Sequence, residues 1–346
     1  MKKIILLISG LIFFTNCNNE TVKYEKVPLP FEKPSNFPEL KYNLESNPLT
    51  DKGFELGKKL FYDGRLSSDG AVACAFCHQQ KFAFTHHGYQ FSHGVEDRKG
   101  TRNSQPIQNM VFQSQFAWDG AAFHLDLFPI IPITNENEMG ETVTNVLEKL
   151  QQDPYYQDLY TLAFEDGKIN TENTFKALSQ FMIMMVSANS KYDKYIRNEP
   201  GGDFTENEKE GLRLFEKKCA SCHKTALFTD DSFKNNGLPI NPEINDVGRM
   251  RVTLLPEDKY KFKVPSLRNI ALTAPYMHDG RFGSLKSVLN FYANGMQETE
   301  NLAPILKHNN GSLGIPMSSE EQQNIILFLE TLTDNEFIND ERFKEK

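Results

Sequence analysis

Apolar residues recur at helical spacing in separate stretches of this chain, and polar stretches divide them. One stretch has an apolar face made of Phe175, Leu178, Phe181, Met182, Met185 and Val186. Another begins at Ser318 and Glu321, a capping-box pattern, and continues with Ile325, Ile326, Leu329 and Leu332. Residues 84–110 and 230–262 contain Gly, Pro and Asn and predict long loops. The pattern predicts a mainly α-helical protein with long loops.

A weak internal repeat divides the chain into two parts. The pattern G-x-x-L-F occurs at residues 57–61 and again at residues 211–215. Thr50 and Thr205 are the predicted N-caps of these two helices, and Thr205 forms a capping box with Glu208. A repeat this long predicts two related domains rather than a solenoid. The predicted domains cover residues 49–197 and 198–346.

Each copy of the repeat leads into a C-x-x-C-H motif, at residues 74–78 and 219–223. This motif is the signature of covalent c-type haem attachment. Two thiols one helical turn apart each add to a haem vinyl group, and the adjacent histidine binds the iron. The predicted attachment and proximal residues are Cys74, Cys77 and His78, then Cys219, Cys222 and His223.

Zinc binding and thiol–disulfide exchange are the alternatives for the cysteine pairs. Two C-x-x-C pairs that share a zinc ion are usually close in sequence, whereas these pairs lie far apart. A thioredoxin-like centre predicts one pair rather than two. Neither alternative explains the histidine that follows each pair, so we expect two haems.

The first residues resemble an export signal. A basic start is followed by a mostly apolar run, residues 4–14, which is too short to span a bilayer. Cys17 stands where a bacterial lipoprotein is cleaved and acylated, although Asn16 before it is a loose match. We expect a lipoprotein-type signal at residues 1–17, a tether at 18–48, and a periplasmic protein anchored to the membrane through Cys17. Ordinary signal cleavage near Cys17 is the alternative.

The charge of the chain is mildly acidic. There are 38 Lys plus Arg and 46 Asp plus Glu, which gives a formal net charge of −8. No basic run indicates nucleic-acid binding. An acidic surface suits a basic electron carrier as a partner, although net charge alone is weak support.

From about residue 51 to residue 334 the chain resembles the bacterial dihaem cytochrome c peroxidase family, which includes the MauG-type enzymes. Several strings in family order surround the two haem motifs. They are residues 60–67, 101–104, 118–120, 246–249, 262–269 and 272–280. The resemblance implies two cytochrome c-like haem domains and a division of labour. The haem of His78 would bind peroxide, and the haem of His223 would accept electrons.

The resemblance also implies the sixth ligands of the two irons. At the first haem the family places a loop histidine, for which His93 is the candidate and His86 and His87 are rivals. Without such a ligand this haem would be open, as in MauG. At the second haem, counting from His278 leads to Tyr292, where MauG has a tyrosine ligand; Met296 is one turn further. A thioether raises the iron potential, whereas a tyrosinate favours the ferric state.

Further roles follow from the same resemblance. Glu138 matches the acid–base carboxylate above the peroxide-binding haem, and Trp118 matches the indole between the haems. Phe128 stands where the family commonly has glutamine, which predicts a drier pocket. Arg249 and His278 belong to the matched strings and are expected near the cofactors. Asn103, Thr273 and Pro275 match the calcium site of the family.

The sequence therefore predicts a dihaem cytochrome c peroxidase that reduces hydrogen peroxide to water. The electrons would come from a small cytochrome or copper protein, and a homodimer is expected because family members often form one. A MauG-like oxidase that modifies another protein is the first alternative. A non-catalytic electron carrier is the second, and Glu138 and Trp118 argue against it.

Overall fold

A computed structural model describes residues 22–224 and 226–345, and most of its regular structure is helical. The α-helices are α1 (Asp51–Phe61), α2 (Cys74–Cys77), α3 (Ile130–Thr134), α4 (Val143–Gln151), α5 (Pro154–Ala163), α6 (Thr171–Met184), α7 (Lys191–Ile196), α8 (Glu206–Lys218), α9 (Met250–Thr253), α10 (Leu285–Asn290), α11 (Ser319–Glu330) and α12 (Asn335–Asn339). Strands β1 (Phe233–Lys234) and β2 (Phe262–Lys263) form a small antiparallel pair. The predicted mainly α fold with long loops is confirmed.

Single helical turns occur within the loops. The 3₁₀ turns are η1 (Gly64–Leu66), η2 (Gln80–Phe82), η3 (Val95–Asp97), η4 (Met110–Phe112), η5 (Leu125–Leu127), η6 (Pro256–Asp258), η7 (Ile270–Leu272), η9 (Pro304–Leu306) and η10 (Glu341–Phe343). One further turn, η8 (Phe291–Gly295), is a π-helix that directly continues α10. Short π-helical segments are often found at functional sites.

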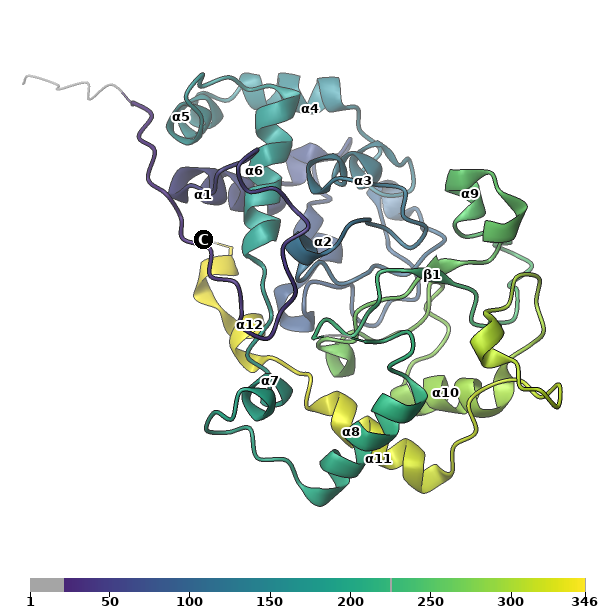
Figure 1. Cartoon of the computed structure of the whole chain (residues 1–346). Helices are drawn as coiled ribbons and strands as arrows, with labels where there is room; N and C mark the ends of the chain where they lie inside the picture. The colour runs from purple at the N-terminus through teal and green to yellow at the C-terminus, as the bar shows by residue number, and fades with distance from the viewer. Residues whose placement is uncertain (1–21, 225, 346) are drawn as a thin grey trace, which may run out of the picture.

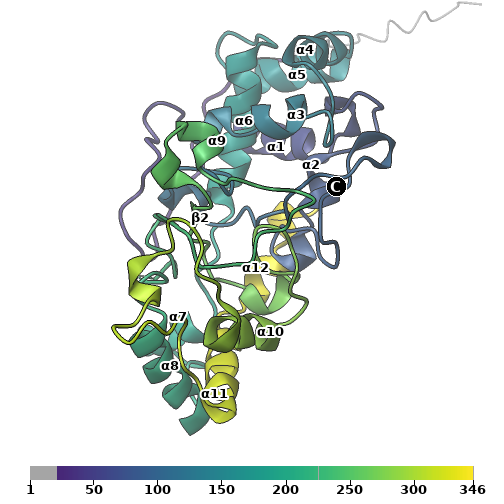
Figure 2. The same ribbon diagram turned by 90° about the vertical axis from the view of Figure 1, so that its right-hand side faces the viewer.

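The predicted repeat corresponds to two similar helix pairs. In the first half α1 packs against α6, and in the second half α8 packs against α11. Figures 1 and 2 show α1, α4, α5 and α6 gathered in one half of the molecule and α7, α8, α10 and α11 in the other. Each helix pair contributes to its own hydrophobic cluster. Each haem motif therefore follows the first helix of its pair, directly after α8 in the second half and after a loop in the first.

The glycine that opens each G-x-x-L-F pattern explains the closeness of these pairs. A Cβ atom on Gly57 would clash with the backbone carbonyl of Ala177 in α6. A Cβ atom on Gly211 would clash in the same way with Asn324 in α11. The pattern therefore places a glycine where one helix backbone meets another.

The predicted N-caps are present. The Thr50 hydroxyl accepts a hydrogen bond from the Gly53 amide at 3.0 Å. Thr205 with Glu208, and Ser318 with Glu321, form complete capping boxes at the starts of α8 and α11. These caps satisfy amides that the first helical turn leaves unpaired.

The segment preceding α1 was expected to be a tether, but much of it packs on the folded body. Phe37 and Tyr42 are buried in the first hydrophobic cluster. The Leu29 amide donates to the Leu49 carbonyl at 3.0 Å, and the Tyr42 hydroxyl donates to Asp126 at 2.8 Å. These aromatic anchors make residues 28–48 part of the body rather than a linker. The expected signal at residues 1–17, including Cys17, lies outside the described residues.

The end of the chain returns to the first half of the molecule. After α11, helix α12 and η10 bring Phe337 and Phe343 into the first hydrophobic cluster. Because this last segment joins the first core, the two hydrophobic clusters do not correspond to two continuous stretches of chain. The predicted domain boundary between residues 197 and 198 stays a prediction. Within the described part of the chain, no helix is long and apolar enough to cross a bilayer.

Candidate haem sites

The first C-x-x-C-H motif forms the short helix α2 and its C-cap, His78. The His78 Nδ1 atom lies 2.8 Å from the Phe84 carbonyl oxygen. Because a carbonyl only accepts, Nδ1 carries the proton and Nε2 keeps the lone pair that a metal needs. Burial lowers the pKa of His78 to about 4, so the ring is neutral. This imidazole therefore has the orientation and the neutral form that a proximal iron ligand requires.

The second motif follows α8 in turns rather than in a helix, but its histidine is held in a similar way. The His223 Nδ1 atom lies 3.1 Å from the Phe228 carbonyl oxygen, so Nδ1 again carries the proton, and the ring has a further hydrogen bond with the Pro265 backbone. Burial lowers the pKa of His223 as well. All four motif cysteines are free thiols. Both motifs thus present two thiols and one fixed, neutral imidazole.

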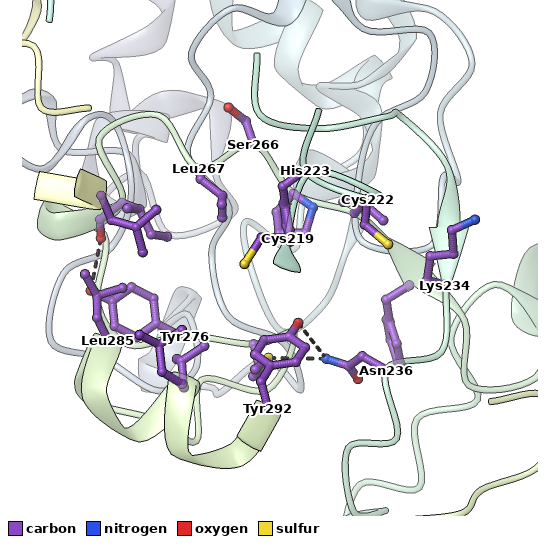
Figure 3. A pocket seen from close by; sticks show the side chains of 18 of the residues that line it. Cys219, Cys222, His223, Lys234, Asn236, Ser266, Leu267, Tyr276, Leu285 and Tyr292 are labelled. Atoms are coloured by element: carbon purple, nitrogen blue, oxygen red, sulfur yellow. Dashed lines mark hydrogen bonds between the residues drawn. The ribbon is translucent and has the colours of Figure 1, made fainter. Parts of the chain in front are cut away.

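A cavity of about 210 Å³ opens beside the second motif. Cys219, Cys222 and His223 lie on one side of it, and Tyr276 and Tyr292 lie across from them (Figure 3). Most of the remaining wall is apolar and comes from loops and helices of the second half, for example Phe215, Leu267, Leu285, Leu289, Ile325 and Leu329. An apolar wall, two thiols and one imidazole suit a porphyrin.

The two expected sixth ligands of the second haem, Tyr292 and Met296, are placed differently. Tyr292 belongs to η8 and lines the cavity, whereas Met296 is absent from its described lining. Met296 follows the end of η8 with an extended backbone, so it leaves the face that Tyr292 occupies. The Tyr292 hydroxyl accepts a hydrogen bond from the Asn236 amide at 3.3 Å. Burial raises the pKa of Tyr292 to about 12.

Three aromatic side chains gather near the first motif. The rings of His86 and Tyr89 lie 4.4 Å apart, and those of Tyr89 and His93 lie 5.0 Å apart. The Nδ1 atom of His86 is buried without a hydrogen-bond partner among the described residues. His93 lies 2.6 Å from the Asp97 carboxylate through Nδ1, which leaves its Nε2 free.

The third histidine of this loop is placed differently. His87 stacks on Phe82 at a centroid distance of 4.1 Å. Its Nδ1 lies 3.2 Å from the Leu272 carbonyl, in the other half of the chain. His87 therefore lies apart from the cluster of His86, Tyr89 and His93.

Glu138 lies beside the loop that carries His93. The Val95 amide donates to the Glu138 carbonyl at 2.7 Å. The Glu138 carboxylate accepts a hydrogen bond from Asn135 at 2.8 Å. Burial raises the pKa of Glu138, although the Asn135 hydrogen bond and the charge of Arg102 oppose the rise. A carboxyl group with a raised pKa is suited to carrying and releasing a proton.

Trp118 connects the two halves. Its indole nitrogen donates to the Asn103 carbonyl at 2.8 Å, and its own carbonyl accepts from the Lys263 amide at 2.7 Å. The ring lines the cavity of the second motif. The backbone amide of Asn103 donates to the His278 carbonyl at 2.7 Å. One side-chain and one backbone hydrogen bond therefore fix the only tryptophan of the chain between the halves.

The expected calcium residues are close together. Asn103, Thr273 and Pro275 line the same cavity wall. The side-chain amide nitrogen of Asn103 donates to the backbone carbonyls of Tyr89 and Gln90 at 3.1 and 3.2 Å. Among the described residues no group of three or more His, Cys, Asp or Glu side chains is arranged for a metal. A calcium ion here would depend on carbonyl, amide and hydroxyl oxygens.

The two remaining cofactor candidates differ in position. His278 lines the cavity and stacks on Phe262 at a centroid distance of 3.7 Å. The guanidinium of Arg249 lies over the Phe233 ring and donates to Gln115 at 2.9 Å. Arg249 is not part of the described cavity wall, so its expected role at a cofactor stays a prediction.

Phe128, the departure from the family pattern, packs against Phe116 with ring centroids 5.7 Å apart. It joins the edge of the first hydrophobic cluster. An apolar ring at this position has no hydrogen-bond donor, and the expected drier pocket stays a prediction.

Three residues of the matched strings form a buried charge network whose role was not predicted, and the more exposed Arg251 joins it. Arg102 makes two bonds to Asp246, at 2.6 and 2.8 Å, and one to Asp119 at 2.7 Å. Arg251 reaches the same Asp119 at 2.8 Å. The network joins loops from both halves beside Trp118. For Arg102, Asp119 and Asp246 the only sequence signal was their occurrence in matched strings, and Arg251 lies outside those strings.

The observations together fit two c-type haems. Each motif has two free thiols and a neutral imidazole whose Nδ1 donates to a backbone carbonyl. The buried Nδ1 atom of His86 has no hydrogen-bond partner among the described residues. The cavity beside the second motif has an apolar wall. The fold and the two sites define a protein with two cytochrome c-like haem centres.

Comparisons with known proteins identify the family to which this dihaem protein belongs. The profile of the family described as di-haem cytochrome c peroxidase matches residues 51–201. The methylamine utilization protein MauG of Methylorubrum extorquens is 35% identical over 310 residues, covering 87% of this chain and 83% of MauG. The cytochrome c551 peroxidase of Pseudomonas aeruginosa is 30% identical over 305 residues, covering 86% of this chain and 83% of the peroxidase.

Solved structures agree with this placement. A MauG-like protein associated with microbial copper homeostasis aligns with a TM-score of 0.81 and 30% identity, covering 91% of this chain and 99% of that protein. The chain belongs to the bacterial family of dihaem cytochrome c peroxidases and MauG proteins. The family implies two c-type haems and a peroxidase-type oxidoreductase function.

Proposed function

We propose that this protein is a MauG-like dihaem enzyme, which uses hydrogen peroxide to oxidise a partner protein. The observation that carries the proposal is the position of Tyr292, across the second cavity from His223, with Met296 outside the cavity wall. An oxygen ligand favours the oxidised states of a haem iron. A haem held in this way is suited to removing electrons from a substrate.

The bound haems would supply peroxide binding and electron storage. His78 and His223 would hold the two irons, and the cysteine thioethers would fix the porphyrins. Glu138 would take a proton from peroxide and return it to the departing oxygen, for which its raised pKa is suited. Trp118 would lie between the two centres. Reduction of one peroxide to two waters consumes two electrons and two protons, and the partner protein would provide the electrons.

A cytochrome c peroxidase is the second candidate, because His93 has the features of a switchable iron ligand. Asp97 holds its Nδ1 at 2.6 Å, as carboxylates often hold metal-binding histidines. Its carbonyl lies 3.7 Å from the Cys77 sulfur, so the loop is next to the first motif. In this alternative, a small cytochrome c or copper protein donates the electrons. A pure electron carrier is the weakest candidate, since it needs no proton-carrying Glu138.

Two tyrosines of one cavity allow a matched test of the ligand. Tyr292→Phe should change the optical and EPR spectra of the oxidised second haem. Tyr276→Phe should leave them unchanged, because the Tyr276 hydroxyl donates to the Ile270 carbonyl at 3.0 Å. Equal spectra in wild type and Tyr292→Phe would contradict tyrosine ligation.

A donor assay separates the two activities. Purified protein would be mixed with peroxide and with reduced cytochrome c or reduced copper protein. A MauG-like enzyme should oxidise these donors slowly, at a small fraction of the rate expected of a peroxidase. Rapid donor oxidation, coupled to peroxide loss at two electrons per peroxide, would favour the peroxidase instead.

We also propose the cellular setting that the sequence suggests. Acylated Cys17 would anchor the protein to a membrane facing the periplasm, and Cys17→Ala should then release it into the soluble fraction. A calcium ion would bind near Asn103, Thr273 and Pro275, so a calcium chelator should alter the haem spectra. A homodimer would appear as a doubled mass in light scattering.

A further inference from the structure

We propose that Asn236 is a positioning residue that tunes the second haem through a hydrogen bond to the oxygen of Tyr292. This inference depends on the proposed tyrosine ligand. Asn236 follows the short strand β1 and lines the same cavity as Tyr292. Its amide nitrogen lies 3.3 Å from the Tyr292 hydroxyl oxygen (Figure 3). That oxygen is the atom that would bind the iron.

The orientation of the Asn236 amide follows from its other contacts. The Leu238 backbone amide donates to the Asn236 side-chain oxygen at 3.3 Å. The oxygen of Asn236 is therefore engaged, and its NH₂ group must face Tyr292. The same NH₂ group lies 3.7 Å from the Met277 sulfur, a weak acceptor. Asn236 thus presents a donor, not an acceptor, to the tyrosine.

Neighbouring contacts hold Asn236 at this position. The carbonyl of Asn235 accepts from the Ala303 amide at 2.9 Å, and its side chain donates to the Glu300 carbonyl at 2.7 Å. The Gly237 carbonyl accepts from the Gln297 amide at 2.9 Å. The residues on either side of Asn236 are therefore tied to the segment that follows η8. The donor is fixed relative to the π-helical turn that carries Tyr292.

A fixed donor changes the chemistry of an oxygen ligand. An oxygen that accepts a hydrogen bond has less electron density to share with iron. The iron is then less strongly stabilised in its oxidised state, so its reduction potential is higher. Asn236 would keep the second haem oxidising enough to take electrons from a substrate, while Tyr292 still favours the ferric state. The effect acts through the ligand, without contact between Asn236 and the iron.

The test compares two asparagines of one loop in the purified dihaem protein. Asn236→Leu removes the donor and should lower the reduction potential of the second haem. It should also move the tyrosinate-to-iron charge-transfer band to longer wavelength. Asn241→Leu makes the same substitution in the same loop at a residue whose side chain accepts from the Glu243 amide instead. It should leave the potential and the band unchanged.

The outcomes separate this inference from the proposed ligand. A wild-type band and potential in Asn236→Leu, with the band lost in Tyr292→Phe, would overturn the role of Asn236 alone. An unchanged spectrum in Tyr292→Phe would overturn the ligand, and the inference with it. Equal shifts in Asn236→Leu and Asn241→Leu would show a general disturbance of the loop and would also overturn it.

Discussion

At the scale of single residues, the two halves use the same device to prepare a metal ligand. A backbone carbonyl, from Phe84 or from Phe228, accepts a hydrogen bond from Nδ1 of the proximal histidine. Each carbonyl lies five or six residues after its histidine, so a short local loop fixes the ring. The remaining differences between the sites come from the other residues near each motif. They are a carboxyl and histidines in one half and a tyrosine in the other.

Glu138→Gln should lower peroxide consumption by ~10²-fold or more, because general acid–base catalysis contributes about that much. Both haems should stay attached, since Glu138 is not part of either motif. The rate would be measured by loss of peroxide absorbance and the haem content by pyridine haemochrome spectra. Glu136→Gln, at an exposed position in the same turn, is the matched control. A wild-type rate in Glu138→Gln would remove this carboxyl group from the mechanism.

The buried pair of Arg102 and Asp246 predicts an acid-sensitive contribution to stability. Burial alone would raise the pKa of Asp246, but the hydrogen bonds and charge of Arg102 lower it below its ordinary value. The folded pKa is therefore below the unfolded one. The contribution is present above ~4, the ordinary pKa of Asp, and is lost as the pH falls through the folded pKa.

Asp246→Asn should accordingly reduce the free energy of unfolding by about 3 kcal/mol at pH 7, because it leaves part of a buried charge unpaired. The deficit should shrink as the pH is lowered below ~4, where the wild-type carboxylate also becomes protonated. Urea unfolding of the haem-loaded protein at several pH values measures both effects. Asp158→Asn, at an exposed site, serves as the control. If the loss of unfolding free energy in Asp246→Asn stayed constant with pH, the ion pair between Arg102 and Asp246 would not be its cause.

The residues that could be predicted from sequence are those with local signals. The haem motifs, Thr205 with Glu208, and Ser318 with Glu321 depend on neighbours within a few positions. Tyr292 and Met296 could not be separated, because a regular helix would place both on one face. The π-helical turn and the extended backbone after it separate them. The pairing of Arg102 with Asp246 spans 144 residues and leaves no local pattern.

At the scale of elements, the glycine of G-x-x-L-F sets the distance between paired helices. Gly57 meets the backbone of α6 and Gly211 meets the backbone of α11. The sequence showed that the two helices were related, but it did not indicate which partners they meet. Because the opposing atoms are backbone atoms, they cannot move aside as a flexible side chain would. Close approach then lets Phe215 and Phe328 pack with ring centroids 5.0 Å apart.

Gly211→Ala should destabilise the second half by about 1–3 kcal/mol, the usual cost of overpacking. Replacing glycine by alanine in a helix also gains roughly 1 kcal/mol in helix propensity. The expected loss of stability is the net value after this gain. Thermal unfolding followed by the second haem's absorbance would report it. Gly283→Ala is the control, since nothing lies within 4 Å of a Cβ atom there. Equal stability of both variants would mean that α8 and α11 can separate without cost.

At the scale of the whole molecule, the two halves are not independent along the chain. The last residues leave the second helix pair and close on the first. The Tyr62 hydroxyl donates to the Phe343 carbonyl at 2.8 Å, and Lys58 donates to the Arg342 carbonyl at 3.1 Å. Gln80, just after the first haem motif, donates to the Asp340 carbonyl at 2.9 Å. The end of the chain thus supports the helix and the loop on both sides of the first motif.

Phe343→Ala should therefore weaken the first half although the residue is third-last among those described. The side chain is 1% exposed and packs against Phe54, Phe84 and Phe181, so the expected loss is about 3–5 kcal/mol. Hydrogen exchange should speed up in α1 and α6 and much less in α8 and α11. Lys344→Ala, at the exposed neighbouring position, should change neither pair. Equal acceleration in both helix pairs would mean that the halves unfold as one unit, and exchange unchanged in α1 and α6 would show that the last segment does not stabilise the first half.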